Sequence, residues 1–197
     1  MKRFYKEVGV EETEGGFHVA LDGRLIKTVK GTPQTVPTRA LAEALAHEWE
    51  AQGEKIDPAS LPLRDMTDYA IDIVAPVPSA VTSKLIAFAD TDTLLYRADP
   101  DEPLYTRQQQ VWEPIVTAFE TAHGVSLKRV SGVIHAAQDE AAMARLQAVM
   151  GEMDAFALAA LETLTSLAAS LTIGLSALEE GADPLHLWQA ASLEEEW

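Results

Sequence analysis

The sequence contains no cysteine among its 197 residues. This absence excludes disulfide bonds, thiol catalysis and thiolate metal sites, and it fits a reducing compartment. The five histidines stand alone, and none has a second histidine four residues away, the spacing that would place two imidazoles on one helix face for zinc. We therefore expect no metal site built from cysteine or histidine.

The motifs that cradle nucleotide phosphates are also missing. The chain has neither a Gly-x-x-x-x-Gly-Lys-Ser/Thr loop nor a Gly-x-Gly-x-x-Gly turn after a strand. Ser176 lacks the second glycine of a nucleophile elbow, and the acids at positions 90, 92, 99, 101 and 102 do not follow the spacing of a calcium loop. We expect no cofactor and no catalytic residue, although a hydrolase or lyase that uses Asp92 and Asp99 stays open as an alternative.

Basic residues are scarce, with 15 Lys and Arg against 31 Asp and Glu, for a formal net charge of −16. Such a balance argues against nucleic acid as a partner, because phosphate binding needs clustered cations. Residues 131–197 hold eleven acids and a single basic residue, Arg145, whereas residues 1–40 hold seven basic residues and five acids. The C-terminal part thus presents a negative field to a partner, or simply keeps the protein dispersed.

One segment, residues 155–178, is apolar enough to raise the question of a membrane span. Glu162 inside it would cost about 2.5–3.5 kcal/mol near a bilayer centre, and no basic residues flank the segment. We expect instead two buried helices with a break near Ala169 and Ser170. The N-terminus shows no secretory or transit pattern, so we expect a bacterial cytoplasmic protein or a mature organelle protein.

The first forty residues are typical of β structure. Apolar residues alternate through residues 17–21, and Asp22-Gly23 then predicts a tight type I′ hairpin turn. The pairs expected across this hairpin are Leu21 with Arg24, Val19 with Ile26, and Phe17 with Thr28. Further strands near residues 4–10 and 34–36 widen the hairpin into a small sheet, which needs a helix packed against it.

Helical patterns dominate after Thr38, a predicted N-cap. We expect one helix from Thr38 to Gly53, a second over residues 63–74, and a third that starts from a cap at Ser79. A long helix is expected over 104–123, with Gly124 ending it. Three more helices are expected after Asp139, the last capped by Asp183. A short strand is expected within 125–137. The fold class is therefore α+β, with a small β-rich N-terminal domain (1–76, including one or two helices) and a larger, mostly helical C-terminal domain (77–197).

A series of short motifs occurs in the order and spacing of a known family: Arg3-Phe4-Tyr5-Lys6, Leu21-Asp22-Gly23-Arg24, Val36-Pro37-Thr38, Glu48-Trp49, Thr91-Asp92, Tyr96-Arg97-Ala98, Trp112-Glu113-Pro114 and Leu193-Glu194-Glu195-Glu196-Trp197. With them the chain resembles, over about 195 residues, the mitochondrial and alphaproteobacterial assembly chaperones that hold the unassembled alpha subunit of the ATP synthase catalytic head. It departs from the family by Val29, where the family tends to have proline, and by ending at Trp197.

This resemblance implies a two-domain α+β protein that binds the free ATP synthase alpha subunit and prevents its aggregation, without enzymatic activity or a cofactor. It also implies the bacterial cytoplasm, or the mitochondrial matrix for organelle relatives, with no membrane insertion, and a monomer is the default. Beside the hydrolase or lyase named above, a generic acidic adaptor that binds many basic proteins stays open as an alternative.

The residues expected to bind the partner fall into four groups. Glu194, Glu195 and Glu196 match the acidic motif of the family and can mimic the carboxylates of a neighbouring subunit. Trp188 and Trp197 are aromatic anchors, whereas Trp49 and Trp112 are expected in the core. Arg97 and Arg107 are rare cations in mid-chain, with an ion pair to Asp92 or Glu113 as the structural alternative. Asp22 and Arg24 mark a hairpin edge that can accept an added strand.

Overall fold

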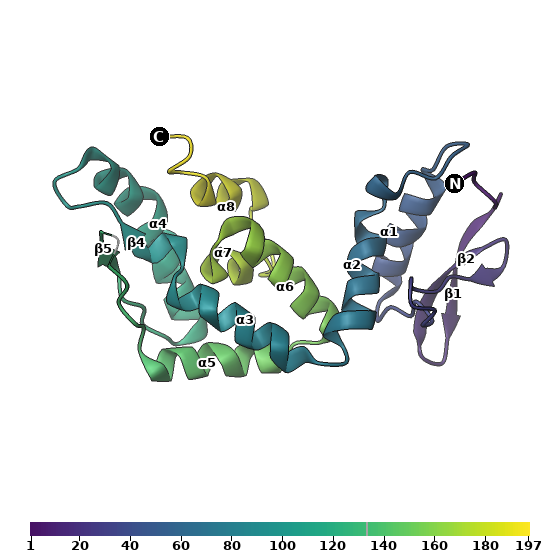
Figure 1. Ribbon diagram of the computed structural model, residues 1–197, viewed down its shortest axis with the longest axis horizontal. Coiled ribbons are helices and arrows are strands. Elements are labelled where there is room, and N and C mark those ends of the chain that lie inside the picture. Colours follow the sequence, from purple (N-terminus) through teal and green to yellow (C-terminus); the bar gives the residue numbers. More distant parts are fainter. Residues whose placement is uncertain (133) are drawn as a thin grey trace. The chain divides into compact units, whose positions relative to one another are not determined.

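The computed structural model describes residues 1–132 and 134–197, and the chain divides into two compact units, Met1–Val77 and Pro78–Trp197 (Figure 1). A small antiparallel sheet lies in the first unit and most of the helices lie in the second. The α+β class predicted from the sequence is confirmed. That the two units are independent folding domains stays a prediction.

The N-terminal sheet consists of β1 (Val8–Thr13), β2 (Gly16–Leu21) and β3 (Arg24–Leu25), antiparallel and in that order. The first strand therefore starts later than the expected residues 4–10. Positive φ angles of 49° at Asp22 and 73° at Gly23 confirm the type I′ turn. The register across the turn pairs Leu21 with Arg24, as predicted.

One predicted pair in this hairpin is wrong. Phe17 does not face Thr28 but pairs with Val36, through two backbone hydrogen bonds of 2.9 Å. The reason is a turn after β3, in which the Thr28 N–H donates to the Thr32 carbonyl and the Gly31 N–H donates to the Thr28 carbonyl. The chain thereby bends away from β2, and the 34–36 segment takes the vacated position.

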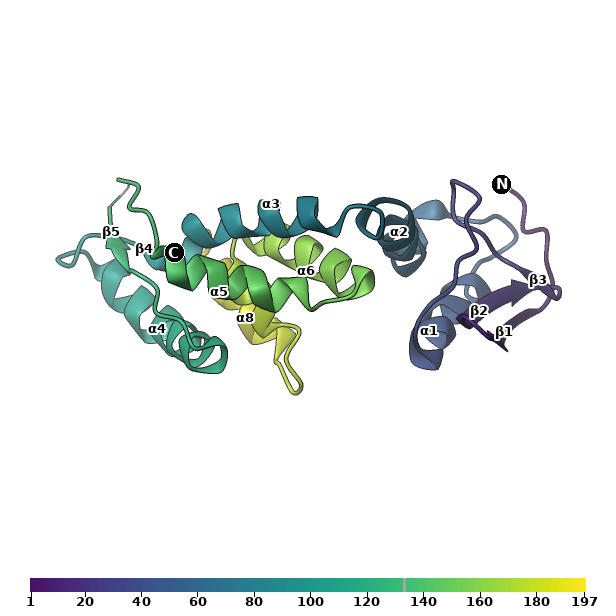
Figure 2. The ribbon, with the colours of Figure 1, turned by 90° about the horizontal axis from the view of Figure 1, so that it is seen from below.

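Helix α1 (Arg39–Glu50) packs on β1 and β2 (Figure 2). Its N-cap is Thr38, whose Oγ1 accepts the Leu41 N–H at 3.2 Å, as predicted. The helix ends at Glu50, before the expected Gly53. The rest of the unit is the 3₁₀ turn η1 (Pro58–Ser60), α2 (Pro62–Tyr69) and the π-helical turn η2 (Ala70–Val74).

The second unit holds most of the helices: α3 (Pro78–Asp90), η3 (Thr93–Leu95), β4 (Tyr96–Arg97), α4 (Pro103–His123), β5 (Val130–Ser131), α5 (Glu140–Gly151), α6 (Ala155–Ala168), α7 (Leu171–Ser176) and α8 (Pro184–Ala191). Helices α3, α5 and α6 lie side by side (Figures 1 and 2). The short strand expected within 125–137 is β5, which pairs in parallel with β4; position 133 of that range lies outside the described residues.

Several predicted helix ends are confirmed. Gly124 ends α4 with φ 66°, and Asp183 caps α8 by accepting the N–H groups of Leu185 and His186. The expected cap at Ser79 is wrong, because α3 already begins at Pro78, whose fixed φ suits the first turn of a helix.

The apolar segment 155–178 breaks where the sequence predicts. Ala169 adopts the left-handed conformation with φ 48°, and Ser170 Oγ accepts the Ile173 N–H at 3.0 Å to start α7. Four helices rather than three therefore follow Asp139. Among the described residues no single helix is both long and apolar enough to cross a membrane, although the segments Pro62–Val74 and Pro78–Leu95 meet that test together.

Candidate functional site

Helix α4 holds the C-terminal end of the chain in place. Its buried residues recur at helical spacing and form one face: Gln108, Trp112, Ile115, Val116 and Phe119. The Trp112 indole Nε1–H donates to the Ala190 carbonyl at 2.7 Å, in a fully buried setting. This hydrogen bond fixes the last turn of α8 on α4.

A groove of about 390 Å³ lies along the contact of α4, α8 and the C-terminal residues; we call it the C-terminal groove. Its lining includes Arg107 and Val111 from α4, His186 and Gln189 from α8, and Glu196 and Trp197. The structure therefore brings Arg107, Glu196 and Trp197 together, three of the residues predicted to bind a partner. The groove offers one arginine, one carboxylate and apolar surface.

Glu194 is held in place from the buried side of α4. Gln108, which is fully buried, donates from Nε2 to Glu194 Oε1 at 2.6 Å and accepts the Ala98 N–H on its Oε1 at 2.9 Å. The Gln108 side chain thus links the segment after β4 to the acidic end of the chain. Glu194 also borders a second hollow of about 600 Å³, beside Asp99 and Glu102.

Glu195 and Glu196 lie beyond the end of α8 and are exposed. Their backbone N–H groups both donate to the Ser192 carbonyl, which turns the chain after the helix. No cation pairs with either carboxylate in the part of the chain that the structure describes. Both charges are therefore available to a partner, next to the helix C-terminus where acids are electrostatically unfavourable.

Arg97 has a structural role, as the alternative drawn from the sequence expects. It is 3% exposed, donates from Nη2 to Glu113 Oε2 at 3.1 Å and from Nε to the Leu94 carbonyl at 2.9 Å, and lies 5.7 Å from the Trp112 ring centre. Burial lowers the pKa of Arg97, and the Glu113 carboxylate opposes that shift. The residue holds β4 against α4, and a role in partner binding stays a prediction.

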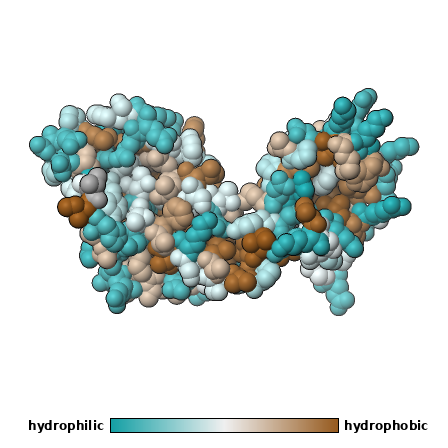
Figure 3. Space-filling view, in the orientation of Figure 1, coloured by the Kyte–Doolittle hydropathy of each residue, from teal (hydrophilic) through white to brown (hydrophobic). Residues whose placement is uncertain are grey.

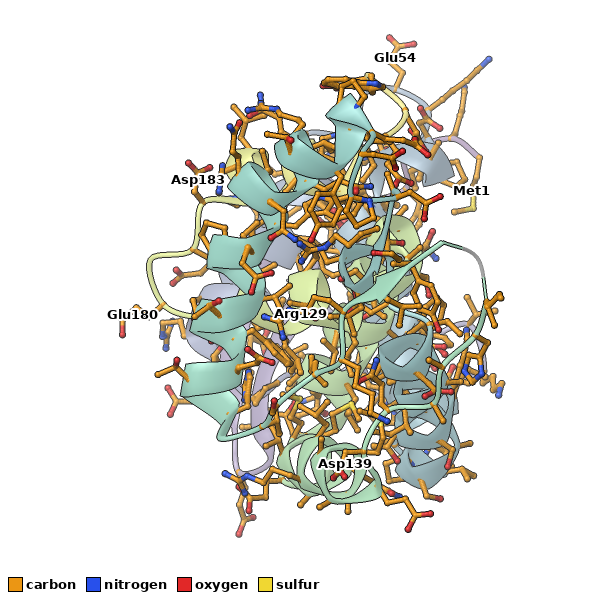
Figure 4. All side chains as sticks on the ribbon, turned by 90° about the vertical axis from the view of Figure 1, so that its left-hand side faces the viewer. Met1, Glu54, Arg129, Asp139, Glu180 and Asp183 are labelled. Carbon is orange, nitrogen blue, oxygen red and sulfur yellow. The ribbon has the colours of Figure 1, made fainter. Side chains whose placement is uncertain are left out.

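Glu113 is shared with a second arginine, Arg129, which approaches α4 from the chain just before β5 (Figure 4). Arg129 also bonds Glu120, about two turns further along α4 than Glu113. Partial burial acts to raise the pKa of Glu113, but the hydrogen bonds and charges of Arg129 and Arg97 outweigh it, so the net pKa is lowered. The carboxylate therefore stays ionised and the network stays paired at neutral pH.

Trp188 does not line the C-terminal groove. It is 51% exposed and lies one turn from Leu185, also exposed, while Leu187 and Ala190 are the buried residues of α8. Both exposed side chains lie on solvent-facing positions of the helix that carries His186 and Gln189. The predicted anchor is accessible, as contact with a partner requires.

Asp22 and Arg24 belong to the N-terminal unit. The Asp22 carboxylate accepts the N–H groups of Lys6 at 2.9 Å and Glu7 at 2.8 Å, and these hydrogen bonds lower its pKa. Asp22 thereby holds the N-terminal segment on the hairpin turn, whereas Arg24 is exposed. The two residues border a hollow of their own unit that also includes Phe4 and Leu25.

Several residues of the C-terminal groove carried no functional expectation from the sequence, among them Val111, His186 and Gln189. The four-residue spacing of Arg107 and Val111, which places both on one side of α4, is the signal that points to a shared surface. Gln108 was missed as well. A lone amide on the otherwise apolar face of α4 indicates a buried polar group that must find partners.

The acids considered for catalysis are used differently. Asp92 is 1% exposed, and its carboxylate accepts the N–H groups of Leu94 at 3.0 Å and Thr172 at 2.8 Å, so it joins η3 to α7; burial raises its pKa. This structural use removes one of the two carboxylates that the hydrolase alternative needs. Within residues 1–132 and 134–197, no cluster of three or more His, Asp or Glu side chains is placed to hold a metal ion.

Comparison with known proteins gives a consistent result. The model of the family described as ATP12 chaperone protein matches residues 2–120. The mitochondrial protein atp12 of Schizosaccharomyces pombe is 27% identical over 190 residues, which cover 90% of this chain but 65% of that protein, so the chain spans less than two thirds of this curated relative.

Solved structures extend the similarity to the whole fold. The crystal structure of Atp12 from Paracoccus denitrificans matches with a TM-score of 0.94 and 37% identity, covering 99% of this chain and 84% of that one. A candidate chaperone from Agrobacterium tumefaciens matches with a TM-score of 0.94 and 36% identity, covering 100% of this chain and 74% of its own.

Proposed function

Because the chain belongs to the ATP12 chaperone family, we propose that it is an ATP synthase assembly chaperone that binds the free alpha subunit and keeps it from aggregating before the catalytic head forms. The family match over residues 2–120 is the observation that carries this proposal. The relatives come from a mitochondrion and from bacteria, which supports the mitochondrial matrix or the bacterial cytoplasm as the place of action.

The physical task requires no bond-making. A subunit outside its complex exposes the surfaces that its neighbours cover in the assembly, and exposed apolar patches of this kind aggregate. A partner that covers those surfaces one to one and leaves when the neighbour arrives is sufficient. We therefore assign the protein to binding rather than to catalysis, with no cofactor, acting as a monomer.

The C-terminal groove and the residues around it fit this task. Glu195 and Glu196 form no ion pair with any described residue, and Trp197 is 65% exposed next to them. An aromatic anchor surrounded by charge is a common arrangement of energetically important interface residues. The net charge of −16 also accelerates encounter with a basic surface on the client. We propose this groove, which Arg107 lines, as the client-binding surface, together with the exposed Trp188 of the same helix α8 outside the lining.

The test of this surface uses charge reversal. The double variant Glu195→Lys/Glu196→Lys is compared with Glu152→Lys, which changes an exposed acid at the end of α5, outside the groove. We expect the double variant to bind purified alpha subunit about tenfold more weakly in titration calorimetry, because two cations then face a basic client. Equal affinity of the double variant and the control variant, with both chains folded, would remove the groove from the proposal.

A generic acidic adaptor is the competing binding function, favoured only by the charge balance. The two functions differ in selectivity. Pull-down from an alphaproteobacterial lysate separates them: one dominant ATP synthase alpha band supports the chaperone, and a broad set of basic proteins supports the adaptor.

A further inference from the structure

The N-terminal unit carries a hollow of about 530 Å³ that we call the hairpin groove, lined among others by Met1, Phe4, Arg24, Leu25, Lys27 and Trp49. Met1, Phe4 and Leu25 are large apolar side chains that stay exposed, at 77%, 63% and 41%. Figure 3 shows apolar surface mixed with hydrophilic surface on this unit. Three such side chains around one hollow leave apolar area that a partner would bury.

The groove borders a free strand edge. In the hairpin, Leu21 pairs with Arg24 across the two-residue turn, and the Ile26 N–H donates to the Val19 carbonyl at 3.0 Å. Because hydrogen-bonding residues alternate along an antiparallel strand, the N–H and C=O of Leu25 point away from β2. β3 is the last strand of its sheet, so in the described part of the chain no strand takes up these two groups.

The charge around the groove is opposite to that of the chain as a whole. Arg24 and Lys27 are exposed, and neither forms an ion pair within the described residues. Asp22, the acid of the lining, accepts the backbone N–H groups of Lys6 and Glu7 and keeps its negative charge, which also acts on Arg24. Two cations against this one carboxylate leave the lining positive on balance beside apolar surface, which is complementary to carboxylates that flank an apolar side chain.

The lining of the groove contains a further polar group, on Trp49. The Trp49 indole Nε1–H is buried and finds no acceptor among the described residues, and the Trp49 ring packs edge-on against Tyr5 at 5.8 Å between centres. A buried donor without an acceptor is costly unless a further group completes it.

From these observations we propose that the hairpin groove binds an extended acidic segment of the client, in which a large apolar side chain fills the groove, carboxylates face Arg24 and Lys27, and the main chain pairs with Leu25. Addition of a strand to a sheet edge is a general mode of peptide recognition, in which the backbone supplies affinity and the side-chain pocket supplies specificity. This inference rests on the proposed function for the origin of the segment. It gives the protein a second contact, of opposite charge to the C-terminal groove.

The experiment uses the full-length chain and two fluorescent probes, measured by anisotropy. The first is the peptide Ser-Glu-Asp-Phe-Val-Asp-Ser, and the second has lysine in place of each acid. We expect the acidic peptide to bind and the basic peptide not to bind. We expect Arg24→Glu/Lys27→Glu to weaken binding of the acidic peptide about tenfold or more, and added salt to weaken it as well.

Lys55→Glu is the matched control, because it reverses an exposed lysine of the same unit outside the groove lining. It should bind the acidic peptide as the wild type does. Circular dichroism confirms that each variant is folded. The inference is overturned if the acidic peptide does not bind, if the basic peptide binds as well, or if the double variant and Lys55→Glu behave alike. An oligonucleotide of equal charge that binds as tightly as the peptide also overturns it.

The peptide assay contains no client, so its outcome is separate from that of the proposed function. If the wild-type chain protects the alpha subunit but binds no acidic peptide, the hairpin groove inference fails and the chaperone function stands. If it binds the peptide but gives no protection, the groove is a peptide site and the assignment of its segment to the client fails.

Discussion

Replacing Gln108 by leucine tests whether the buried amide on α4 holds the acidic end of the chain in place. The substitution keeps the approximate volume of the side chain and removes both of its hydrogen bonds, to the Ala98 N–H and to Glu194. Leucine fills the same fully buried position. The change therefore isolates the polar link from the packing.

The expected loss of stability follows from the two groups that lose their hydrogen bond to Gln108. An orphaned backbone N–H in a partly buried position costs about 1–3 kcal/mol, and Ala98 is only half-buried. Glu194 is exposed, so its carboxylate binds water once Gln108 is replaced, and losing the hydrogen bond to Gln108 adds only a few tenths of a kcal/mol. We expect Gln108→Leu to lower the free energy of unfolding by about 2 kcal/mol. For a unit of the size of Pro78–Trp197, which contains Gln108, this corresponds to a decrease in Tm of roughly 8 °C.

The assay is thermal and urea unfolding followed by circular dichroism and by tryptophan fluorescence, since three of the four tryptophans lie in the C-terminal unit. The matched control is Gln110→Leu, two residues along the same helix at an exposed position, which should change the free energy of unfolding by less than about 0.5 kcal/mol. If Gln108→Leu unfolds at the same urea concentration as Gln110→Leu, the amide does not provide the link described here.

Two further predictions concern stability. Gly174→Ala should lower the free energy of unfolding in urea by about 1–3 kcal/mol, because an added Cβ would lie 2.2 Å from Thr165 Oγ1. The control is Gly151→Ala, where an added Cβ meets nothing within 4 Å, and it should be neutral or stabilising. Equal effects of the two substitutions would refute the close contact of α7 with α6. Burial lowers the pKa of His123, so the neutral side chain contributes its full stability above the ordinary pKa of 6.5, and this contribution is lost as the pH falls through the lower pKa of the folded state. His123→Gln should therefore flatten the decline in the free energy of unfolding between about pH 7 and pH 5. An unchanged decline in the variant would contradict this account.

The sequence predicts the elements that depend on local chemistry. The turn at Asp22-Gly23, the caps at Thr38 and Asp183, the stop at Gly124 and the break near Ala169 are all confirmed. Each of these depends on the conformational preference of one or two residues and their nearest backbone groups. Such preferences can be predicted from the sequence without knowledge of the rest of the fold.

What the sequence does not predict depends on residues far apart along the chain. The pairing of Phe17 with Val36 follows from how the 28–32 turn closes, and the link between Gln108 and Glu194 joins residues 86 positions apart. The ion pair of Arg97 with Glu113 was anticipated as an alternative, but the sharing of Glu113 with Arg129 was not. The meeting of Arg107 and Trp197 in one groove needs the docking of α8 on α4.

Aggregation of the isolated client tests the central claim most directly. Purified ATP synthase alpha subunit is diluted from denaturant, and light scattering is recorded with increasing amounts of the full-length chain, with an unrelated acidic protein of similar charge as control. If the chain masks client surface, scattering falls until the two proteins are equimolar and then stays low, without ATP. Equal scattering with and without the chain, or equal suppression by the control protein, would contradict the account.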